Sequence, residues 1–420
     1  MANPRAFFQT HFHGLLAALA VAAVYSTLAV LRHSEALIWD EGRYLDCARN
    51  MTRGFYATDD NPDFVNGPGY PIVLLPFVLA GAEGLLPARL LNAFFMAGAA
   101  WFAWLLLRHY AGAAWAAAGA WLTGFHPTLL WMGFAIMTEP LAMFCMAGFA
   151  WSFCAAVRGG GRGMMLTAAF LLGWLTLTRV FFGHVIMAAA LPCLALLPFW
   201  KSWRHVLART LVILGGAFLL CTPWLVHTWQ KTGRVLCWST NSGELLYWMT
   251  SHHEGENGHW FTTEDAVAHP QLAPNHKDFY ERVMRMPILQ RDAFLMEAAM
   301  ANLRADPARV AYNWACNLSR MAFGFPRSFL PEELRTVVLI AVNGPVIALA
   351  SLLGLVGLWR WRSVPPEVWL LAVFAAIYLG GGSVAPALPR YFALMLPVLM
   401  LGIATVWSRN VRLSLMKSAG

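Results

Sequence analysis

The feature that most constrains this chain of 420 residues is a series of apolar runs separated by short polar segments. Each run is about 20 residues long, which is the length of helix that crosses the roughly 30 Å of hydrocarbon in a bilayer. The composition agrees, because 59% of the residues are hydrophobic and only 12% are charged, whereas soluble domains are about one quarter charged. We therefore expect an all-α integral membrane protein that crosses the bilayer many times.

The apolar runs predict ten spanning helices, and a further apolar piece is judged too short to cross. Residues 70–86 contain Pro71, Pro76 and Glu83, which are all costly inside a spanning helix. We predict that this piece forms a juxtamembrane or shallow re-entrant helix. The ten expected spans lie near residues 14–31, 88–107, 112–130, 136–157, 164–179, 181–199, 207–227, 333–358, 367–381 and 389–407.

The positions of the charged residues predict which way the chain faces. With ten spans, the short loops rich in Lys and Arg all lie on the side that holds both termini, while the acidic residues, apart from Glu367, lie on or near the other side. Basic loops mark the cytoplasmic side. We expect a protein of the cytoplasmic (inner) membrane with both termini cytoplasmic and its active face outward. Because the net charge of +8 is spread over these loops, it gives no sign of a nucleic-acid partner.

This topology divides the chain into three parts. Residues 1–227 form a transmembrane catalytic module that includes the first outer loop, 32–87; residues 228–332 form a small, mainly helical periplasmic cap; and residues 333–420 supply the last membrane helices. Within the first loop, Leu45, Ala48 and Met51 recur at helical spacing. That pattern predicts a helix lying in the membrane interface with its apolar face toward lipid.

Charged residues recur where the expected spans reach the outer face. Asp40 and Glu41 follow the first span, and Glu139, Arg179 and Arg390 lie at the outer ends of three others. Charges at such positions are costly and tend to serve function. Asp40 or Glu41 could instead cap the helix that follows, and the sequence leaves that alternative open.

These residue types suit the transfer of a sugar from a lipid phosphate. A hydroxyl acceptor has a high pKa, so its attack on a sugar carbon needs a carboxylate within hydrogen-bonding reach. The departing phosphate gains negative charge, which a guanidinium answers with paired donors. In this scheme Asp40 accepts the proton and Arg43 holds the phosphate.

Several motifs resemble those of the C-type (GT-C) membrane glycosyltransferases, in the branch of the protein O-mannosyltransferases and lipid A aminoarabinose transferases. The resemblance implies a GT-C fold and an inverting transferase that uses a polyprenyl-phosphate monosaccharide. The acceptor would be a hydroxyl on a lipid, a lipid-linked glycan or a protein, and no metal or other cofactor is expected. In chain order the motifs are "WDEGRYLDCA", "VNGPGYPIVLLP", "HPTLLWMGFAIMTEPLAMF", "LTLTR", "TPWLVHTWQKTG", "RADPARVAYNW" and "PRYFALMLPVL".

The resemblance also implies roles for the residues in the first motif. Asp40, the first acid of the pair, is the expected general base, and Glu41 beside it is expected to support the catalytic loop. Arg43 and Tyr44 are expected to contact the donor phosphate.

The other motifs supply the remaining candidates. The aminoarabinose branch has Lys-Pro-Pro-Leu where this chain reads "NGPGYP" at 66–71, so the phosphate contact of that lysine is expected from Arg390 or Arg179. Glu139, His126 and Tyr70 are the expected residues of the acceptor site or pocket.

Two other kinds of function remain open at this stage. A flippase for polyprenyl-linked glycans, or a secondary transporter, would use Asp40 and Glu139 as proton-coupled carboxylates. Against it, transporters place such charges near the bilayer midplane in repeated halves. A noncatalytic lipid-binding partner is the third reading.

Two features of the cap also predict local structure. The histidine-rich stretch at 251–260 lacks the ligand spacing of a zinc site, so we expect a solvated polar loop. Cys237 and Cys316 both fall outside the spans and could pair in an oxidising compartment.

Overall fold

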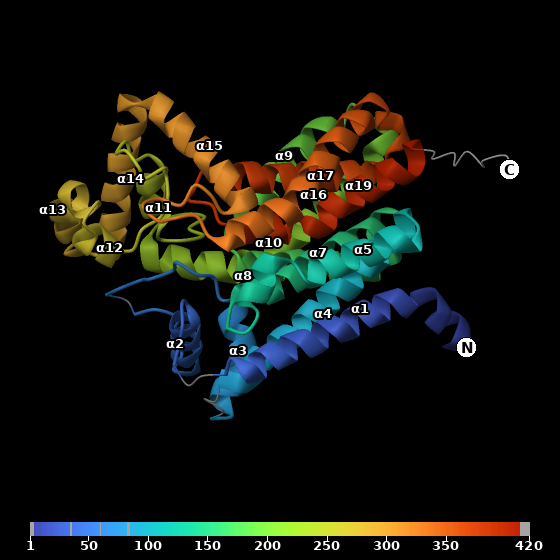
Figure 1. Cartoon of the computed structure of the whole chain (residues 1–420), viewed down its shortest axis with the longest axis horizontal. Helices are drawn as coiled ribbons and strands as arrows, with labels where there is room; N and C mark the ends of the chain where they lie inside the picture. Colours follow the sequence, from blue (N-terminus) through green and yellow to red (C-terminus); the bar gives the residue numbers. More distant parts are fainter. Residues whose placement is uncertain (1–3, 34–35, 59, 82–84, 412–420) are drawn as a thin grey trace.

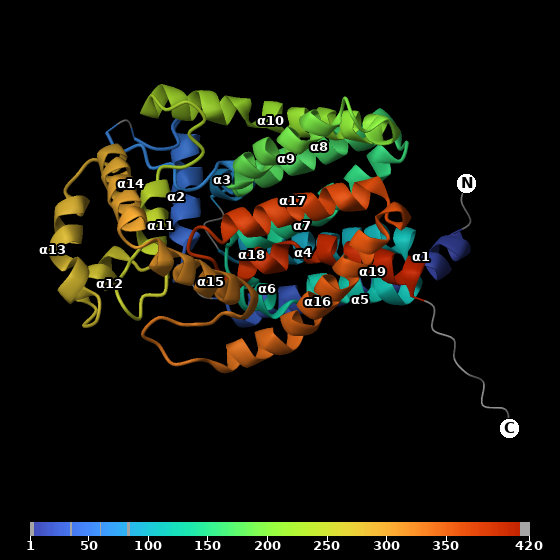
Figure 2. The ribbon, with the colours of Figure 1, turned by 90° about the horizontal axis from the view of Figure 1, so that it is seen from above.

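A computed structural model describes residues 4–33, 36–58, 60–81 and 85–411, and within these ranges it contains helices and connections but no strand. The long helices run side by side, and a smaller group of helices caps one end of the bundle (Figures 1 and 2). The prediction of an all-α, polytopic membrane protein is confirmed.

Five helices in the described residues are long and apolar enough to cross a membrane, by length and composition. Each of them overlaps one of the ten predicted spans. They are α1 (Pro4–Leu31), α4 (Leu85–Tyr110), α7 (Thr138–Val157), α10 (Arg204–Thr232), which a short helical turn precedes, and α16 (Leu334–Trp359).

The other five predicted spans are shorter or interrupted, and their crossing remains a prediction. One is broken after α5 because His126 precedes a proline and takes an extended backbone, with ψ 129°. The last is broken at Met395, before the proline-containing first turn of α19. These segments are α5 (Ala113–Gly124) with α6 (Pro127–Met132), α8 (Gly161–Thr178), α9 (Phe182–Leu196), α17 (Pro366–Gly382), and α18 (Pro389–Leu394) with α19 (Leu396–Asn410).

Two short helices lie in the first outer loop. Helix α3 (Gly69–Leu79) has 11 residues and is therefore about 16 Å long, too short to cross the bilayer. Helix α2 (Glu41–Thr52) packs its apolar face against α3, and Leu45 and Ala48 are buried in the core that the membrane helices share. The expectation that this face meets lipid was wrong, because another helix of the same loop already covers it.

The cap has a hydrophobic core of its own, which includes Trp248, Tyr280 and Leu295. Glycines in the left-handed conformation end the helices that enter and leave it, since Gly233 follows α10 and Gly324 follows the last cap helix. The cap helices are α11 (Ser242–Met249), α12 (Thr263–Ala268), α13 (Ala273–Met284), α14 (Ile288–Ala305) and α15 (Pro307–Phe323).

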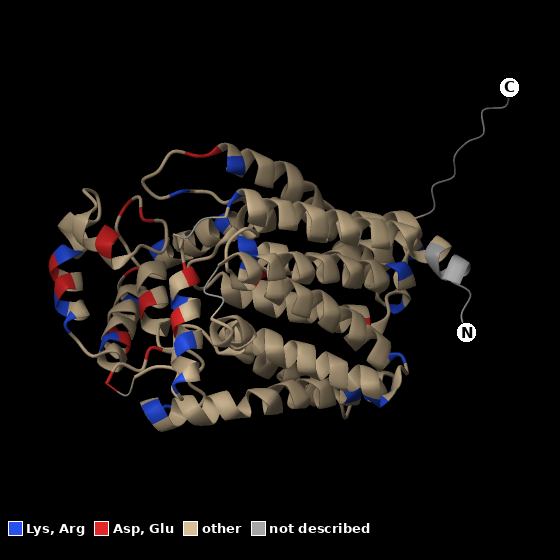
Figure 3. Ribbon diagram, turned by 90° about the horizontal axis from the view of Figure 1, so that it is seen from below, with Lys and Arg blue, Asp and Glu red and all other residues tan. Residues whose placement is uncertain are grey.

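The charged residues divide between the two ends of the bundle. Asp and Glu are almost confined to the end that carries the cap, whereas Lys and Arg occur at both ends (Figure 3). Helix α1 begins and α19 ends at the far end, away from the cap (Figure 1). The first described helix therefore begins, and the last one ends, at the end of the bundle opposite the cap.

Candidate active site

Asp40 lies at the cap end of the bundle, immediately before α2. Asp40 is the N-cap residue of α2 by position, but its side chain accepts no capping hydrogen bond from the helix. It is half-buried, and no hydrogen bond or ion pair joins its carboxylate to another described residue. The preceding residue, Trp39, has φ 51°, which is uncommon for a bulky side chain and occurs mainly at constrained sites. Asp40 is therefore a carboxylate held in place by its backbone and left open to other groups.

Glu41, the second acid of the pair, has a different environment. It is fully buried and paired with Arg89 of α4, whose Nε and Nη2 lie 3.1 and 3.0 Å from the two carboxylate oxygens. The backbone amides of Ile38 and Ile136 donate to the same two oxygens at 2.9 and 2.8 Å. Four donors thus occupy this carboxylate, which ties the start of α2 to α4 and to the segment before α7.

Three charged residues from distant parts of the chain form a cluster at the same end of the bundle. Glu139 begins α7 and is only 3% exposed, Arg179 ends α8, and Arg390 begins α18. Arg390 Nη1 donates to Glu139 Oε1 at 2.9 Å, and Arg179 Nη2 donates to the same oxygen. Two guanidinium groups and one carboxylate leave a net positive charge, and Arg390 Nε is buried without a hydrogen-bond partner. We call these three residues the Glu139 cluster.

A small cavity lies against the Glu139 cluster. Because its lining includes two tyrosines, two arginines and Glu139, the cavity offers hydroxyl, guanidinium and carboxylate groups beside an apolar wall. Asp40 is outside this lining. The lining residues are Leu129, Glu139, Ala142, Arg179, Tyr378, Arg390, Tyr391 and Leu394.

Tyr44 connects Asp40 with the Glu139 cluster. It lies one helical turn beyond Asp40, is buried, and meets Tyr70 edge to face with ring centroids 5.3 Å apart. Burial raises the pKa of Tyr44 to about 12, and the charges of Arg179, Glu139, Asp40 and Arg390 also act on it. Because the charges of Asp40 and of the cluster act on one phenol, Asp40 and the cluster belong to one neighbourhood.

Arg43 is not among the residues that pair with Glu139 or line the cavity beside it. It is exposed, and no hydrogen bond or ion pair joins its side chain to another described residue. Burial raises the pKa of Glu244 in the cap, and the positive charges of Arg291 and Arg43 oppose that rise. The charge of Arg43 therefore reaches Glu244 in the cap, whereas Arg179 and Arg390 are paired with Glu139.

His126 and Tyr70 are enclosed by protein. His126 caps α6, accepting from the amide of Thr128 at 3.3 Å, and its Nε2 lies 2.9 Å from the amide oxygen of Asn343 in α16. These contacts join α6 to α16. Tyr70 is 1% exposed, and its hydroxyl has no hydrogen-bond partner among the described residues. Of the two, Tyr70 is the one that adjoins the site, through Tyr44.

Sequence reasoning missed four residues at or beside the site. Tyr378 and Tyr391 line the cavity, Arg89 holds Glu41, and Thr138 donates to Glu139 at 3.4 Å. Tyr391 and Thr138 each adjoin a charged residue that was chosen, so their proximity was visible in the sequence. Arg89 offered a clearer signal, because it is a charged residue in the first turns of a membrane helix.

The expectation of a solvated loop at 251–260 was wrong for its central residue. Glu256 is 1% exposed, lies 2.7 Å from His276 Nε2 and accepts a hydrogen bond from Ser251. Burial acts to raise the pKa of Glu256, and these hydrogen bonds outweigh it and hold the pKa below its ordinary value. The cap thus buries a polar network, and Tyr247 extends it through a 2.9 Å contact with His276.

Neither a disulfide between the cap cysteines nor a metal-binding group of side chains is formed in the described part of the chain. Cys237 and Cys316 are both free thiols, so the pairing that the sequence left open is not formed. No group of three or more His, Cys, Asp or Glu side chains in the described ranges could hold a metal ion.

Comparison with known proteins finds likeness in structure alone. No family model and no curated protein matches the chain. An archaeal oligosaccharyltransferase, AglB from Archaeoglobus fulgidus in complex with an inhibitory peptide and a dolichol-phosphate, is similar with a TM-score of 0.48 and 14% identity. The similarity covers 96% of this chain and 50% of AglB, so this chain spans about half the length of that protein.

A second similar structure is ArnT from Cupriavidus metallidurans bound to undecaprenyl phosphate. Its TM-score is 0.42 at 16% identity, over 93% of this chain and 76% of ArnT. Both proteins are C-type glycosyltransferases, the family that the motifs of this chain resemble.

Proposed function

We propose that this chain is a membrane glycosyltransferase that moves a monosaccharide from a polyprenyl phosphate to a hydroxyl acceptor on a lipid, a lipid-linked glycan or a protein. One observation carries the proposal. Asp40 is an unpaired carboxylate at the end of a membrane bundle, and its charge acts on the same buried tyrosine, Tyr44, as the charges of a buried cluster with net positive charge. A base and an anion site side by side are what transfer from a lipid phosphate requires.

Arg179 and Arg390 are the proposed phosphate site. Glu139 neutralises one of the two guanidinium groups and fixes both in position, which leaves one positive charge for an anionic ligand. Arginine suits a phosphate because its planar donors can bind two oxygens at once. All three residues lie at ends of membrane segments, so a phosphate bound there can keep its isoprenoid tail in the bilayer.

In the proposed reaction, Asp40 takes the proton from the acceptor hydroxyl as its oxygen attacks the anomeric carbon of the sugar. The new carbon–oxygen bond forms while the bond from that carbon to the phosphate oxygen breaks. The electron pair leaves with the polyprenyl phosphate, whose added negative charge meets Arg179 and Arg390. A single displacement of this kind inverts the anomeric centre. The residues complete the step with no metal ion or cofactor.

Glu41 and Arg43 take supporting parts in this proposal. Glu41 holds the backbone that presents Asp40, because its four hydrogen bonds anchor the first turn of α2. Arg43 would contact the donor phosphate from the cap side. Since Arg43 is exposed, we assign the larger part of phosphate binding to the buried pair.

The decisive experiment compares Asp40→Asn with the wild-type protein, both purified and folded, using a polyprenyl-phosphate sugar as donor. Loss of the general base is expected to lower kcat by about 10²–10⁴-fold. Asp46→Asn is the matched control, because Asp46 lies on α2, the helix that Asp40 precedes, but is exposed and paired with Arg49. Turnover of Asp40→Asn near the wild-type value would reject the assignment.

We also propose that the cap faces away from the cytoplasm of a cell with an inner membrane. The far end of the bundle carries Lys and Arg with hardly any acidic residue (Figure 3), which is the pattern of cytoplasmic loops. A reporter that is active only in the cytoplasm, fused after the last residue, is expected to be active. An inactive reporter, together with activity of a second reporter that works only outside the cytoplasm and is fused at the same position, would reverse the orientation.

A further inference from the structure

A large apolar cavity lies at the end of the bundle opposite the cap, far from the candidate active site. Its volume is about 400 Å³, and its walls come from α7, α9, α10 and α17. Helix α10 ends beside the cap, so its first turns, which supply Leu207 and Thr210 to the cavity, lie at the far end. The hydroxyl of Thr210 is already bonded to the carbonyl oxygen of Val206, so the wall offers a ligand almost purely apolar contact.

The cavity reaches the apolar outer surface of the bundle, which we expect the membrane to cover. Leu358 and Val373 line it and are 61% and 42% exposed. An apolar cavity at this depth and with such an opening can be reached by a hydrocarbon chain from the bilayer. A water-soluble ligand would have to cross lipid to enter by this route.

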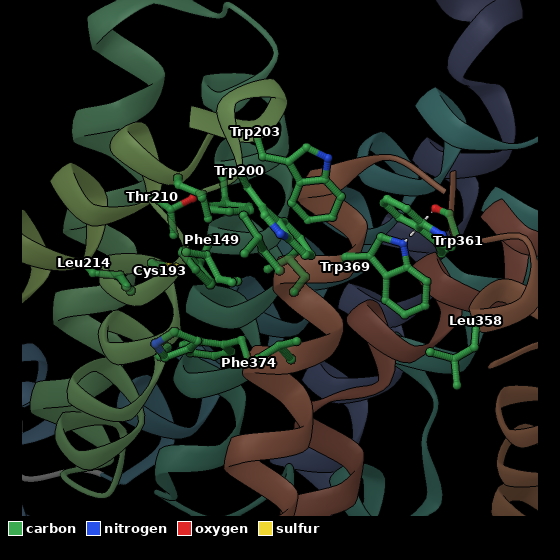
Figure 4. Close-up of a pocket in the computed structure, with 18 residues that line it drawn as sticks. Phe149, Cys193, Trp200, Trp203, Thr210, Leu214, Leu358, Trp361, Trp369 and Phe374 are labelled. Atoms are coloured by element: carbon green, nitrogen blue, oxygen red, sulfur yellow. Dashed lines mark hydrogen bonds between the residues drawn. The ribbon is translucent and has the colours of Figure 1, made fainter. Parts of the chain in front are cut away.

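Tryptophans from two connections gather at one end of the cavity (Figure 4). Trp200 and Trp203 belong to the α9–α10 connection and lie 4.8 Å apart between ring centroids. Trp361 belongs to the α16–α17 connection, 6.3 Å from Trp200. Trp369 donates a 3.2 Å hydrogen bond to the carbonyl oxygen of Trp361. Tryptophans at the ends of membrane helices mark the level of the lipid headgroups.

The same two connections carry four basic side chains. Lys201 and Arg204 flank Trp203, and Arg360 and Arg362 flank Trp361. All four are exposed, and none makes a side-chain hydrogen bond or ion pair with another described residue. The tryptophan-lined end of the cavity is therefore bordered by positive charge on both sides.

The acidic residue nearest to these connections in the sequence does not neutralise that charge. Glu367 begins α17, but its side chain is buried, accepts a 2.9 Å hydrogen bond from Tyr110 and lies 3.9 Å from Arg158. Its negative charge is thus committed to partners on α4 and after α7. The four basic side chains remain available to an anion at the membrane surface.

We propose that this cavity binds an acyl chain of an anionic glycerophospholipid from the leaflet at the end where α1 begins. The chain fills the apolar space, the tryptophans lie at the level of the glycerol backbone, and the phosphate lies between the two basic connections. Charge complementarity selects an anionic over a zwitterionic headgroup, since basic residues at a cytoplasmic membrane surface attract anionic lipids. The polyprenyl-phosphate donor is a different lipid, because its proposed phosphate site is at the opposite end of the bundle.

The test measures lipid binding to the purified protein by native mass spectrometry, with phosphatidylglycerol and phosphatidylcholine of the same acyl chains. Phosphatidylglycerol is expected to bind more tightly. The double variant Lys201→Gln/Arg362→Gln is expected to weaken its binding by about 25-fold, or about fivefold for each charge removed. The matched control is Arg108→Gln/Arg162→Gln, which removes two exposed charges from the same end of the bundle and is expected to change nothing.

A second variant tests the cavity itself. Ala189 lines the wall, and Ala189→Leu is expected to narrow the cavity and to weaken the binding of both lipids. The melting temperature of the lipid-free protein is expected to stay unchanged. Equal binding of the two lipids by the wild-type protein would overturn the proposal, as would equal effects of the two double variants. It would also be overturned if polyprenyl phosphate displaced the bound lipid and phosphatidylglycerol did not. The outcome is independent of the proposed reaction, because none of these residues belongs to the candidate active site.

Discussion

Arg390 donates a 2.9 Å hydrogen bond to Glu139, although 251 positions separate the two residues in the chain. The bond joins the start of the last membrane segment to the start of α7, and the end of α8 joins them through Arg179. Removing one member of a buried ion pair leaves its partner uncompensated and costly. The Glu139 cluster therefore sets the relative positions of three helix ends and, with them, the shape of the proposed phosphate site.

Arg390→Gln is expected to lower kcat/KM for a polyprenyl-phosphate sugar by about 10²–10³-fold, the usual cost of removing one donor that stabilises developing negative charge. The kcat/KM of Arg390→Lys should lie between the values of the wild type and Arg390→Gln, because lysine keeps the charge but lacks paired donors. Initial rates of sugar transfer measure the effect. Arg409→Gln, at the far end of the same membrane segment, should match the wild type. A rate for Arg390→Gln close to that of the control would remove Arg390 from the site.

Arg179→Gln is expected to lower kcat/KM at least about tenfold more than Arg43→Gln does. Arg179 is largely enclosed with Glu139, whereas Arg43 is exposed, and a charge in a low-dielectric site interacts more strongly with a phosphate than one in water. Salt distinguishes the two positions further, because exposed charges are screened and enclosed ones much less. If Arg43→Gln had the larger effect, the phosphate would lie on the cap side of α2.

The fold class could be predicted from sequence because membrane helices carry their own signal. Length, hydropathy and the absence of charge depend on the bilayer, and neighbouring helices affect them little. The breaks at His126 and Met395, which divide two predicted spans, depend on proline positions that hydropathy does not weigh. The lipid-facing assignment of α2 failed for a related reason. An apolar helix face predicts that the face is buried, but it does not distinguish burial by lipid from burial by another helix such as α3.

The sequence predicted which residues belong to the candidate site better than it predicted how those residues contact one another. Glu139, Arg179 and Arg390 were chosen because charges at membrane helix ends are costly, and the structure brings all three together. The different environments of Asp40 and Glu41 could not be read from sequence, because Glu41 is distinguished by Arg89, 48 positions away. Glu256 was wrongly expected in a solvated loop for the same reason, since its burial depends on His276 from another part of the cap.

Glu41→Gln is expected to destabilise the protein by about 3–5 kcal/mol, because Arg89 would remain buried without its counter-ion. The double variant Glu41→Gln/Arg89→Gln should recover part of that loss, since it leaves no unpaired charge in the interior. Melting temperatures of the single and double variants in the same detergent measure both effects. Equal or greater loss in the double variant would show that the pair contributes through packing instead of charge.

The same comparison separates a structural role of Glu41 from a chemical one. If Glu41 only positions the first turn of α2, the double variant should regain transfer activity in step with its stability. A double variant that recovers its melting temperature while kcat stays about 10²-fold low would instead place Glu41 in the chemistry beside Asp40.

The cap is expected to lose stability as the pH falls below 6.5. Burial, followed by the charges of Arg320 and Arg327, lowers the pKa of His259 to about 3 from its ordinary value of 6.5. Between these values the unfolded cap binds a proton that the folded cap does not, so stability decreases by up to about 1.4 kcal/mol per pH unit. Above pH 6.5 both states are neutral at this position and the contribution is constant.

Unfolding measured at pH 7.5 and pH 5.0 tests this directly, with an expected difference of about 2 kcal/mol from His259. His259→Gln should remove that part of the difference because glutamine does not titrate. His252→Gln is the matched control, since His252 belongs to the same loop but is exposed. If His259→Gln retained the full pH dependence and His252→Gln lost it, the sensitive group would be His252, and the partly buried His259 would have no part in the response.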